Sequence, residues 1–171
     1  MVFTVCLALV SLVISQAWFL LLTGAILVWL VWFVRTRPES TFFLRAMERE
    51  HDRKRFPGKG AILLLVGAFL TGLLFPAHIA PALLVLGVAD SFSTVVGMRF
   101  GKKRIGTSNK TWMGTATFFV CSCAVLAFFS SWWLVVALIA TTAEFINYHR
   151  FLLLDDNLVI PLVVAASLLV L

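Results

Sequence analysis

Four carboxylates in this sequence stand in or beside long apolar stretches, where an acidic side chain is unusual. They are Asp90, Glu144, Asp155 and Asp156, and the other four acids lie in the basic segment 35–59. A charged side chain at the centre of a bilayer costs roughly 2.5–3.5 kcal/mol on insertion scales, so acids in apolar segments usually have a function. These four residues are therefore the first candidates for catalysis or metal binding.

Asp90 lies within the apolar run 61–98, beside a stripe of small residues. Small side chains recur there every four positions, at Ala89, Ser93, Gly97 and Gly101. Residues four apart share one face of a helix, and small residues on that face let two helices approach closely. We expect Asp90 to face the interior of a helix bundle, as a metal ligand or as a catalytic acid or base. The alternative is a buried carboxylate that pairs with a lysine or arginine for packing alone.

The segment 99–114, RFGKKRIGTSNKTWMG, combines basic side chains with glycines and hydroxyl groups. It precedes a helix that we expect to begin near Trp112. Lysines, backbone N–H groups and the positive end of a helix dipole all favour phosphate. A phosphate-binding loop is one interpretation, and an ordinary basic loop that binds lipid headgroups is the other. The Walker pattern of nucleotide-binding loops does not occur in the sequence.

The acidic pair Asp155 and Asp156, followed by Asn157, opens the last apolar run. Carboxylate and amide oxygens are hard ligands of the kind that Mg²⁺ takes. Asp and Asn are also preferred helix N-caps, and position 156 or 157 is where a cap belongs. Both roles stay open, because one residue could cap the helix while another binds metal.

The composition predicts a membrane protein. Of the 171 residues, 61% are hydrophobic and 13% are charged, with a mean hydropathy of +1.03, whereas soluble domains carry about 25% charged residues. Such a chain cannot cover its surface with polar groups, so we expect lipid to be its solvent. The net charge of +6 arises mostly in segments 35–59 and 99–110. Because stacking aromatics are not interleaved with these basic runs, we expect no nucleic-acid partner.

Apolar runs separated by polar residues predict an all-α, polytopic bundle of six or seven transmembrane helices. The run 2–34 exceeds the roughly 20 residues that one span needs. A tight turn at Ser15 and Gln16 would divide it into two helices. One long tilted helix is an alternative, and a cleaved signal followed by a helix is another, although the start lacks a basic segment.

The later runs divide into helical hairpins. Two prolines, Pro76 and Pro81, predict a break that leaves helices near 61–76 and 80–98. The run 112–148 divides at Ser130 and Ser131, and 157–171 forms the last helix.

Hairpins place the charged segments on one side. Each hairpin returns the chain to the side that it left, so segments 35–59, 99–110 and 149–156 share one face. All 14 basic residues then lie on that face, which the positive-inside rule makes cytoplasmic. The sequence thus predicts one integral membrane domain over residues 1–171. It comprises one or two N-terminal helices (1–34), a basic cytoplasmic loop (35–60) and a helical core (61–171), and it leaves a homodimer open.

Three stretches together resemble the polyprenol kinase family, which includes dolichol kinases, phytol kinases and the CTP-dependent diacylglycerol kinases. Residues 88–101, VADSFSTVVGMRFG, are similar to the family's A-D-x-x-A-x-x-x-G-x-x-x-G. Residues 109–115, NKTWMGT, look like K-[ST]-x-E-G-[ST], with Met113 at the position of the usual Glu. Glu144 and residues 155–161, DDNLVIP, are similar to the closing E…D-N-x-x-[IV]-P. The basic run 52–61 also looks like the family's loop before its next helix.

The resemblance implies transfer of the γ-phosphoryl group of a nucleoside triphosphate, CTP in the characterised eukaryotic branches. The acceptor would be the hydroxyl of a membrane lipid alcohol, such as a polyprenol, a phytol-like alcohol or diacylglycerol, and Mg²⁺ or another divalent cation would be the cofactor. The implied catalytic residues are Asp90, Lys110, Glu144 and Asp156, and the implied metal ligands are Asp90, Asp155 and Asp156. Together with the charge of the basic segment 99–114, the expected nucleotide contacts are Lys102, Lys103, Arg104, Asn109, Lys110, Thr111 and Gly114.

Two other functions stay open. Similar patterns occur in phosphatidate cytidylyltransferases, which move a cytidylyl group onto a lipid phosphate with the same nucleotide and metal. A small transporter or flippase would use Asp90 and Glu144 as relay groups within the membrane. That function needs polar residues on both faces, and the hairpin tips 76–81 and 130–131 carry almost none. We therefore expect the kinase.

Overall fold

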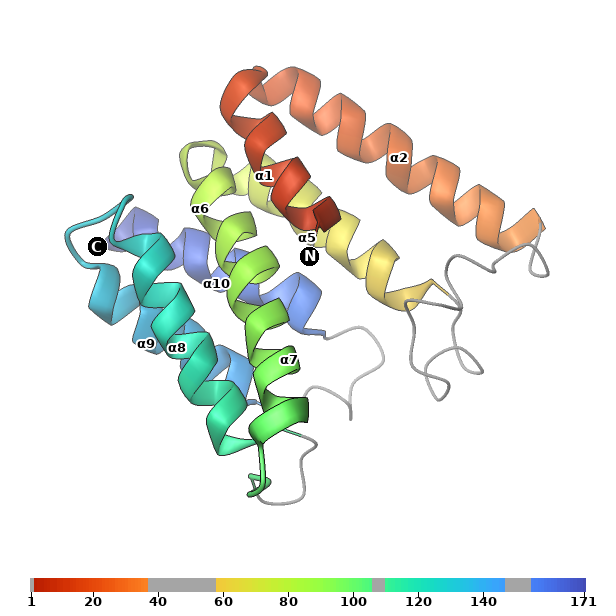
Figure 1. Ribbon diagram of the computed structural model, residues 1–171. Helices are drawn as coiled ribbons and strands as arrows, with labels where there is room; N and C mark the ends of the chain where they lie inside the picture. Colours follow the sequence, from red (N-terminus) through yellow and green to blue (C-terminus); the bar gives the residue numbers. More distant parts are fainter. Residues whose placement is uncertain (1, 37–57, 106–109, 147–154) are drawn as a thin grey trace.

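The computed structural model describes residues 2–36, 58–105, 110–146 and 155–171 of the chain. These residues form helices and the turns next to them, and their one β contact is an isolated antiparallel bridge between Arg104 and Thr111. Seven helical segments pack side by side in the described part of the chain (Figure 1). The predicted all-α architecture of six or seven helices is therefore confirmed.

The N-terminal run forms two helices, α1 (Val2–Val13) and α2 (Gln16–Thr36). The chain turns at Ile14 and Ser15, where the sequence predicted a break. The side-chain amide of Gln16 donates a hydrogen bond to the carbonyl of Gly72, 3.0 Å away, which fixes the start of α2 beside the end of the helix Lys59–Leu74. The interpretation as one long helix is therefore wrong.

Helix α5 (Lys59–Leu74) begins after Gly58, whose φ of 81° is a left-handed conformation that glycine adopts at little steric cost. A continuous helical segment then runs over Pro76–Phe100. It starts with η2 (Pro76–His78) and α6 (Ile79–Leu84) and ends with α7 (Ser91–Phe100). Pro81 falls within the first turn of α6, where a missing N–H is tolerated, so the break lies at Phe75 and not between the prolines.

Between α6 and α7 the helix widens into a π-helical stretch, η3 (Val85–Asp90). Stretches of this kind are rare and frequently occur at functional sites. The last residue of η3 is Asp90, one of the four acids that the sequence singles out.

The remaining helices are α8 (Trp112–Leu126), α9 (Trp133–Phe145) and α10 (Asp156–Val170). The N-cap of α10 is Asp155, whose Oδ1 accepts from the backbone N–H of Asn157 at 3.2 Å. The cap thus lies one residue before the expected positions 156 and 157, because Asp155 is the last residue with extended backbone.

Pro161 lies inside α10 and cannot donate a hydrogen bond to the carbonyl of Asn157, four residues earlier. This carbonyl faces Gly67 of α5, and a Cβ at position 67 would lie 2.6 Å from it. The glycine therefore lets α10 begin directly against the backbone of α5.

Two apolar cores share the central helices. One joins α5, α6 and η3 to α8, α9 and α10, with Phe118, Leu126 and Ile160 fully buried. The other packs α1 and α2 against α5 and α6, around Phe19 and Leu83. Because α5 and α6 contribute to both cores, the described helices form one body, and α1 and α2 are its outer layer.

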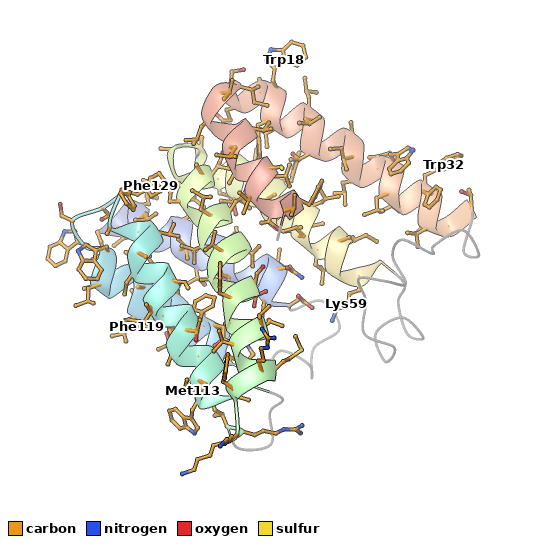
Figure 2. All side chains as sticks on the ribbon, viewed as in Figure 1. Trp18, Trp32, Lys59, Met113, Phe119 and Phe129 are labelled. Carbon is orange, nitrogen blue, oxygen red and sulfur yellow. The ribbon has the colours of Figure 1, made fainter. Side chains whose placement is uncertain are left out.

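The outer layer leaves much apolar surface exposed. Only 17% of the most apolar stretch of α2 is buried, against 56% for the segment Pro76–Phe100. Figure 2 shows Trp18 and Trp32 on the outer side of α2. By length and composition these two helices could each cross a membrane, and the other five described helices are shorter but also apolar.

Candidate active site

Most of the described acidic and basic residues lie where helices end or begin, at one side of the bundle. Lys59 opens α5, the acids Asp155 and Asp156 open α10, and Glu144 lies in the last turn of α9. In Figure 1 these ends lie toward the lower right, whereas the α1–α2 turn, the α8–α9 turn and the C-terminus lie at the upper left. The expected one-sided charge is thus confirmed for these residues, and the basic residues of 37–57 and Arg150 lie outside the described part.

Lys110 is the centre of this charged end. Its Nζ lies 3.1 Å from Oε1 of Glu144 and 3.0 Å from Oδ2 of Asp156, and it also donates to the backbone carbonyl of Glu144. These partners stand 34 and 46 positions further along the chain. One ammonium group therefore joins the start of α8, the end of α9 and the start of α10.

The connection between α7 and α8 holds Lys110 in place. The N–H of Ile105 donates to the carbonyl of Lys110 at 2.9 Å, and the N–H of Trp112 donates to that of Lys103 at 3.2 Å. Immediately after Lys110, the Oγ1 of Thr111 caps α8 by accepting from the N–H of Gly114 at 3.1 Å. The backbone around Lys110 is thus fixed by these hydrogen bonds.

Glu144 is buried, with 4% of its surface exposed, and both of its carboxylate oxygens have partners. Oε1 pairs with Lys110, and Oε2 accepts from Oγ1 of Thr115 at 3.3 Å. A buried carboxylate is stable only when it is paired and hydrogen-bonded, and Glu144 meets both conditions. Thr115 lies in the second stretch of the family resemblance, although it was not among the expected site residues.

Lys59 is a site residue that the sequence analysis missed. Its Nζ lies 3.7 Å from Oδ2 of Asp155, and only 12% of its side chain is exposed. Figure 2 shows it at the start of α5. The signal was present in the sequence, since Lys59 is the last basic residue of segment 35–59 and stands directly before an apolar run.

Asp90 is half-buried beside this network. Its carboxylate lies close enough to Asp156, Lys110 and Glu144 for their charges to act on it. Among the described residues, however, it takes part in no ion pair or side-chain hydrogen bond, and only its backbone carbonyl accepts, from Oγ of Ser93 at 2.9 Å. The structure therefore does not match the expectation of a carboxylate paired for packing.

The small-residue stripe packs against the start of α8, as predicted. A Cβ at Gly97 would lie 2.9 Å from Oγ1 of Thr111, and a Cβ at Gly114 would lie 3.0 Å from the carbonyl of Ser93. Thr111 and Gly114 therefore serve capping and close packing between α7 and α8, and their contact with phosphate stays a prediction.

Three of the other expected phosphate ligands lie outside the cluster. Lys102, Lys103 and Arg104 are exposed on the connection between α7 and α8. Asn109 lies outside the described residues. Their predicted contact with a nucleotide remains untested by the geometry, and only Lys110 of the basic set is bound to the acids.

The donor set has the charge that a divalent cation requires. Four carboxylates (Asp90, Glu144, Asp155 and Asp156) and the two lysines Lys59 and Lys110 lie in this part of the fold, which leaves a formal charge of −2. Among the described residues, no three His, Cys, Asp or Glu side chains are gathered closely enough to hold a metal ion. Instead, the ammonium of Lys110 occupies the space between two of the acids. In charge and donor type the residues fit Mg²⁺, with Lys110 in the position of a cation.

The electrostatics keep Lys110 charged. Burial by itself lowers the pKa of this lysine, but the carboxylates of Asp156 and Glu144 outweigh burial. The net effect is a pKa above the ordinary lysine value of 10.5. Lys110 is therefore an ammonium at any physiological pH.

Two curated relatives share part of this chain. An uncharacterized protein of Methanocaldococcus jannaschii is 34% identical over 116 residues, which cover 66% of this chain and 59% of the relative. An uncharacterized protein of Rickettsia prowazekii is 29% identical over 133 residues, covering 72% of this chain and 63% of the relative. The chain thus spans about three fifths of the length of the curated relatives it matches. No family model and no solved structure matches it.

Proposed function

We propose that the protein is a multi-pass membrane lipid kinase that transfers the γ-phosphoryl group of CTP, or of another nucleoside triphosphate, to the hydroxyl of a lipid alcohol. The observation that carries this proposal is the cluster around Lys110. It brings Lys110 together with Asp90, Glu144 and Asp156, and these four residues come from the three stretches that resemble the polyprenol kinases.

Membrane insertion is the first part of the proposal. The outer face of α2 exposes Trp18, Trp29 and Trp32 together with aliphatic side chains. Soluble monomers rarely expose apolar patches of more than a few hundred Å². An apolar groove of about 750 Å³ also lies between α2 and α5, lined by residues that include Leu20, Trp32 and Phe69. Lipid is the solvent that suits this surface, and the charged end would then be cytoplasmic by the positive-inside rule.

The triphosphate would bind at the charged end. Phosphoryl transfer depends on positioning and on neutralising the charge of the phosphate oxygens. The exposed Lys102, Lys103 and Arg104 are placed to attract the nucleotide, and Lys110 is the cation closest to the acids. A divalent cation held by Glu144 and Asp156 would supply further charge neutralisation on the transferred group.

The acceptor hydroxyl needs a base. Its oxygen attacks the γ-phosphorus, the bond from the γ-phosphorus to the bridging oxygen breaks, and the nucleoside diphosphate leaves with that oxygen. The hydroxyl proton goes to a carboxylate. Asp90 suits this role because, among the described residues, its carboxylate makes no ion pair. It also lies in the segment Pro76–Phe100, ten residues before its end, where a lipid headgroup could reach it from the bilayer.

The test is a transfer assay with the purified protein in detergent, CTP and a panel of polyprenols, phytol and diacylglycerol. With CTP labelled at the γ-phosphate, we expect labelled lipid phosphate as the product. Asp90→Asn should reduce the rate roughly 10²–10⁴-fold, the range that a general base contributes. Lys110→Ala should abolish transfer.

Arg35→Gln is the matched control, because Arg35 is an exposed charge at the end of α2 that takes no part in the cluster. It should keep its activity within about twofold of the parent. Label that moves from the α-phosphate onto lipid would indicate a cytidylyltransferase instead. Full activity of Asp90→Asn would remove the site assignment.

A further inference from the structure

The position of Lys110 affects how the proposed site would bind a divalent cation and a nucleotide. Its Nζ sits within 3.1 Å of two carboxylates, where it acts as an internal counter-ion. Thr115 fixes the second oxygen of Glu144, and Lys59 and the cap of α10 engage Asp155. Glu144 and Asp155 therefore have partners in the fold other than Lys110, and the backbone of Asp156 is fixed as the first residue of α10. The ammonium of Lys110, by contrast, lies at the end of a flexible four-carbon stem.

A divalent cation that binds the same acids would meet this ammonium. Two cations cannot share Oε1 of Glu144 and Oδ2 of Asp156 without strong repulsion, since like charges a few Å apart in a partly buried site interact strongly. The ammonium of Lys110 must then leave the acids. Away from them it is a buried or half-buried cation that needs a new anionic partner.

We propose that Lys110 is a displaceable counter-ion that couples cation binding to polyanion binding. A divalent cation takes the carboxylate oxygens of Glu144 and Asp156, and the released ammonium of Lys110 pairs with the phosphates of the incoming nucleotide. Each ligand then raises the affinity for the other, and by linkage the two effects are equal. This inference rests on the proposed function only for the identity of the polyanion.

The coupling gives a specific expectation for the protein without nucleotide. The wild-type chain should bind a divalent cation weakly, because Lys110 competes for the acids. Lys110→Met keeps most of the side-chain volume and removes the charge. The variant should bind the cation more tightly, although it has lost the residue expected to be essential for catalysis.

The experiment is equilibrium dialysis of the purified, detergent-solubilised protein against Mn²⁺, with protein-bound metal measured by electron paramagnetic resonance. Without nucleotide, Lys110→Met should bind Mn²⁺ about tenfold more tightly than wild type or better. Lys110→Arg, which keeps the charge, should bind as weakly as wild type, and the control Arg35→Gln should not change. Adding Glu144→Gln to Lys110→Met should weaken binding again, which locates the ion.

The second arm measures CTP binding at fixed free Mn²⁺ without a lipid acceptor. The affinity of wild type for CTP should rise with free Mn²⁺, and the rise should be much smaller in Lys110→Met. If folded Lys110→Met, checked by its thermal unfolding, binds Mn²⁺ no more tightly than wild type, the inference is overturned.

Neither arm requires turnover, so the two proposals fail separately. If the protein shows the expected Mn²⁺ binding but transfers no phosphate to any lipid, the counter-ion proposal stands and the kinase proposal is wrong. If the protein is an active kinase but does not show the expected Mn²⁺ binding, the kinase proposal stands and the counter-ion proposal is wrong.

Discussion

The α1–α2 layer and the group formed by α8, α9 and α10 have similarly apolar sequences but differ in the residues at their helix ends. In α8, α9 and α10 the helix ends carry charged or capping residues that contact one another, as Lys110, Glu144 and Asp156 do. In α1 and α2 the one charged residue among those described is Arg35, at the exposed end. The comparison indicates that one region is organised around a polar site and the other covers the shared central helices.

The largest expected effect comes from truncating one fully buried side chain in each apolar core. Phe118 and Phe19 are both fully buried, the first beside α9 and α10 and the second between α2 and α5. Phe118→Ala and Phe19→Ala should each reduce the free energy of unfolding by about 3–5 kcal/mol, because each leaves a cavity. Only Phe118→Ala should also lower the activity per folded molecule.

The measurement is chemical unfolding in detergent together with the transfer rate, corrected for the folded fraction. An equal loss of specific activity in Phe19→Ala would mean that the outer layer belongs to the functional unit, and the division into two regions would be wrong.

A smaller effect is expected from adding one methyl group in each region. At Gly67 the added Cβ would lie 2.6 Å from the carbonyl of Asn157, so the start of α10, with Asp155 and Asp156, must shift. Gly67→Ala should destabilise the fold by about 1–3 kcal/mol, the usual range for overpacking, and should weaken Mn²⁺ binding.

Gly24→Ala is the matched change in α2, where the nearest atom would be a ring carbon of Phe69 at 3.5 Å. This is ordinary contact, and alanine favours a helix over glycine by about 1 kcal/mol. Gly24→Ala should be neutral or stabilising in the same unfolding assay. Destabilisation by both substitutions to a similar degree would contradict the contrast between the regions.

The smallest effect concerns alkaline pH. Folding raises the pKa of Lys110, so its contribution to stability is fully present below the unfolded value of 10.5 and is lost as the pH rises through the higher folded value. The melting temperature of wild type should therefore decline more steeply above pH 10.5 than that of Lys110→Met. From pH 7 to 10 the difference between the two proteins should stay constant. A difference that changes between pH 6 and 9 would assign the pH dependence to another group.

The sequence predicted helices and their ends better than the partners of individual side chains. Hydropathy and prolines locate α5, α8 and α10 because membrane-length apolar runs and missing N–H groups act locally. That Asp90, Lys110, Glu144 and Asp156 act at one site was implied by the family resemblance of the three stretches. By contrast, the pairing of Lys59 with Asp155 depends on how α5 and α10 are rotated about their axes.

That rotation is set by close contacts between distant residues. Gly67 against the carbonyl of Asn157 is one such contact, and no local pattern reveals it. The same limit applies to Lys110, which the sequence assigned to phosphate and the structure places on two acids. A basic loop can meet either partner, and only the fold brings the acids within reach.

The π-helical stretch η3 has a consequence for how homologous sequences align with this chain. A π turn holds about one residue more than the α turn that it replaces, so loss of a single residue within 85–90 would restore a regular helix and keep Asp90 facing the same neighbours. Elsewhere between residues 79 and 100 a deletion would rotate every later side chain by roughly 100°. Homologous chains that lack the wide turn should therefore align with a one-residue gap here, and searches that require a fixed spacing across this helix would overlook them.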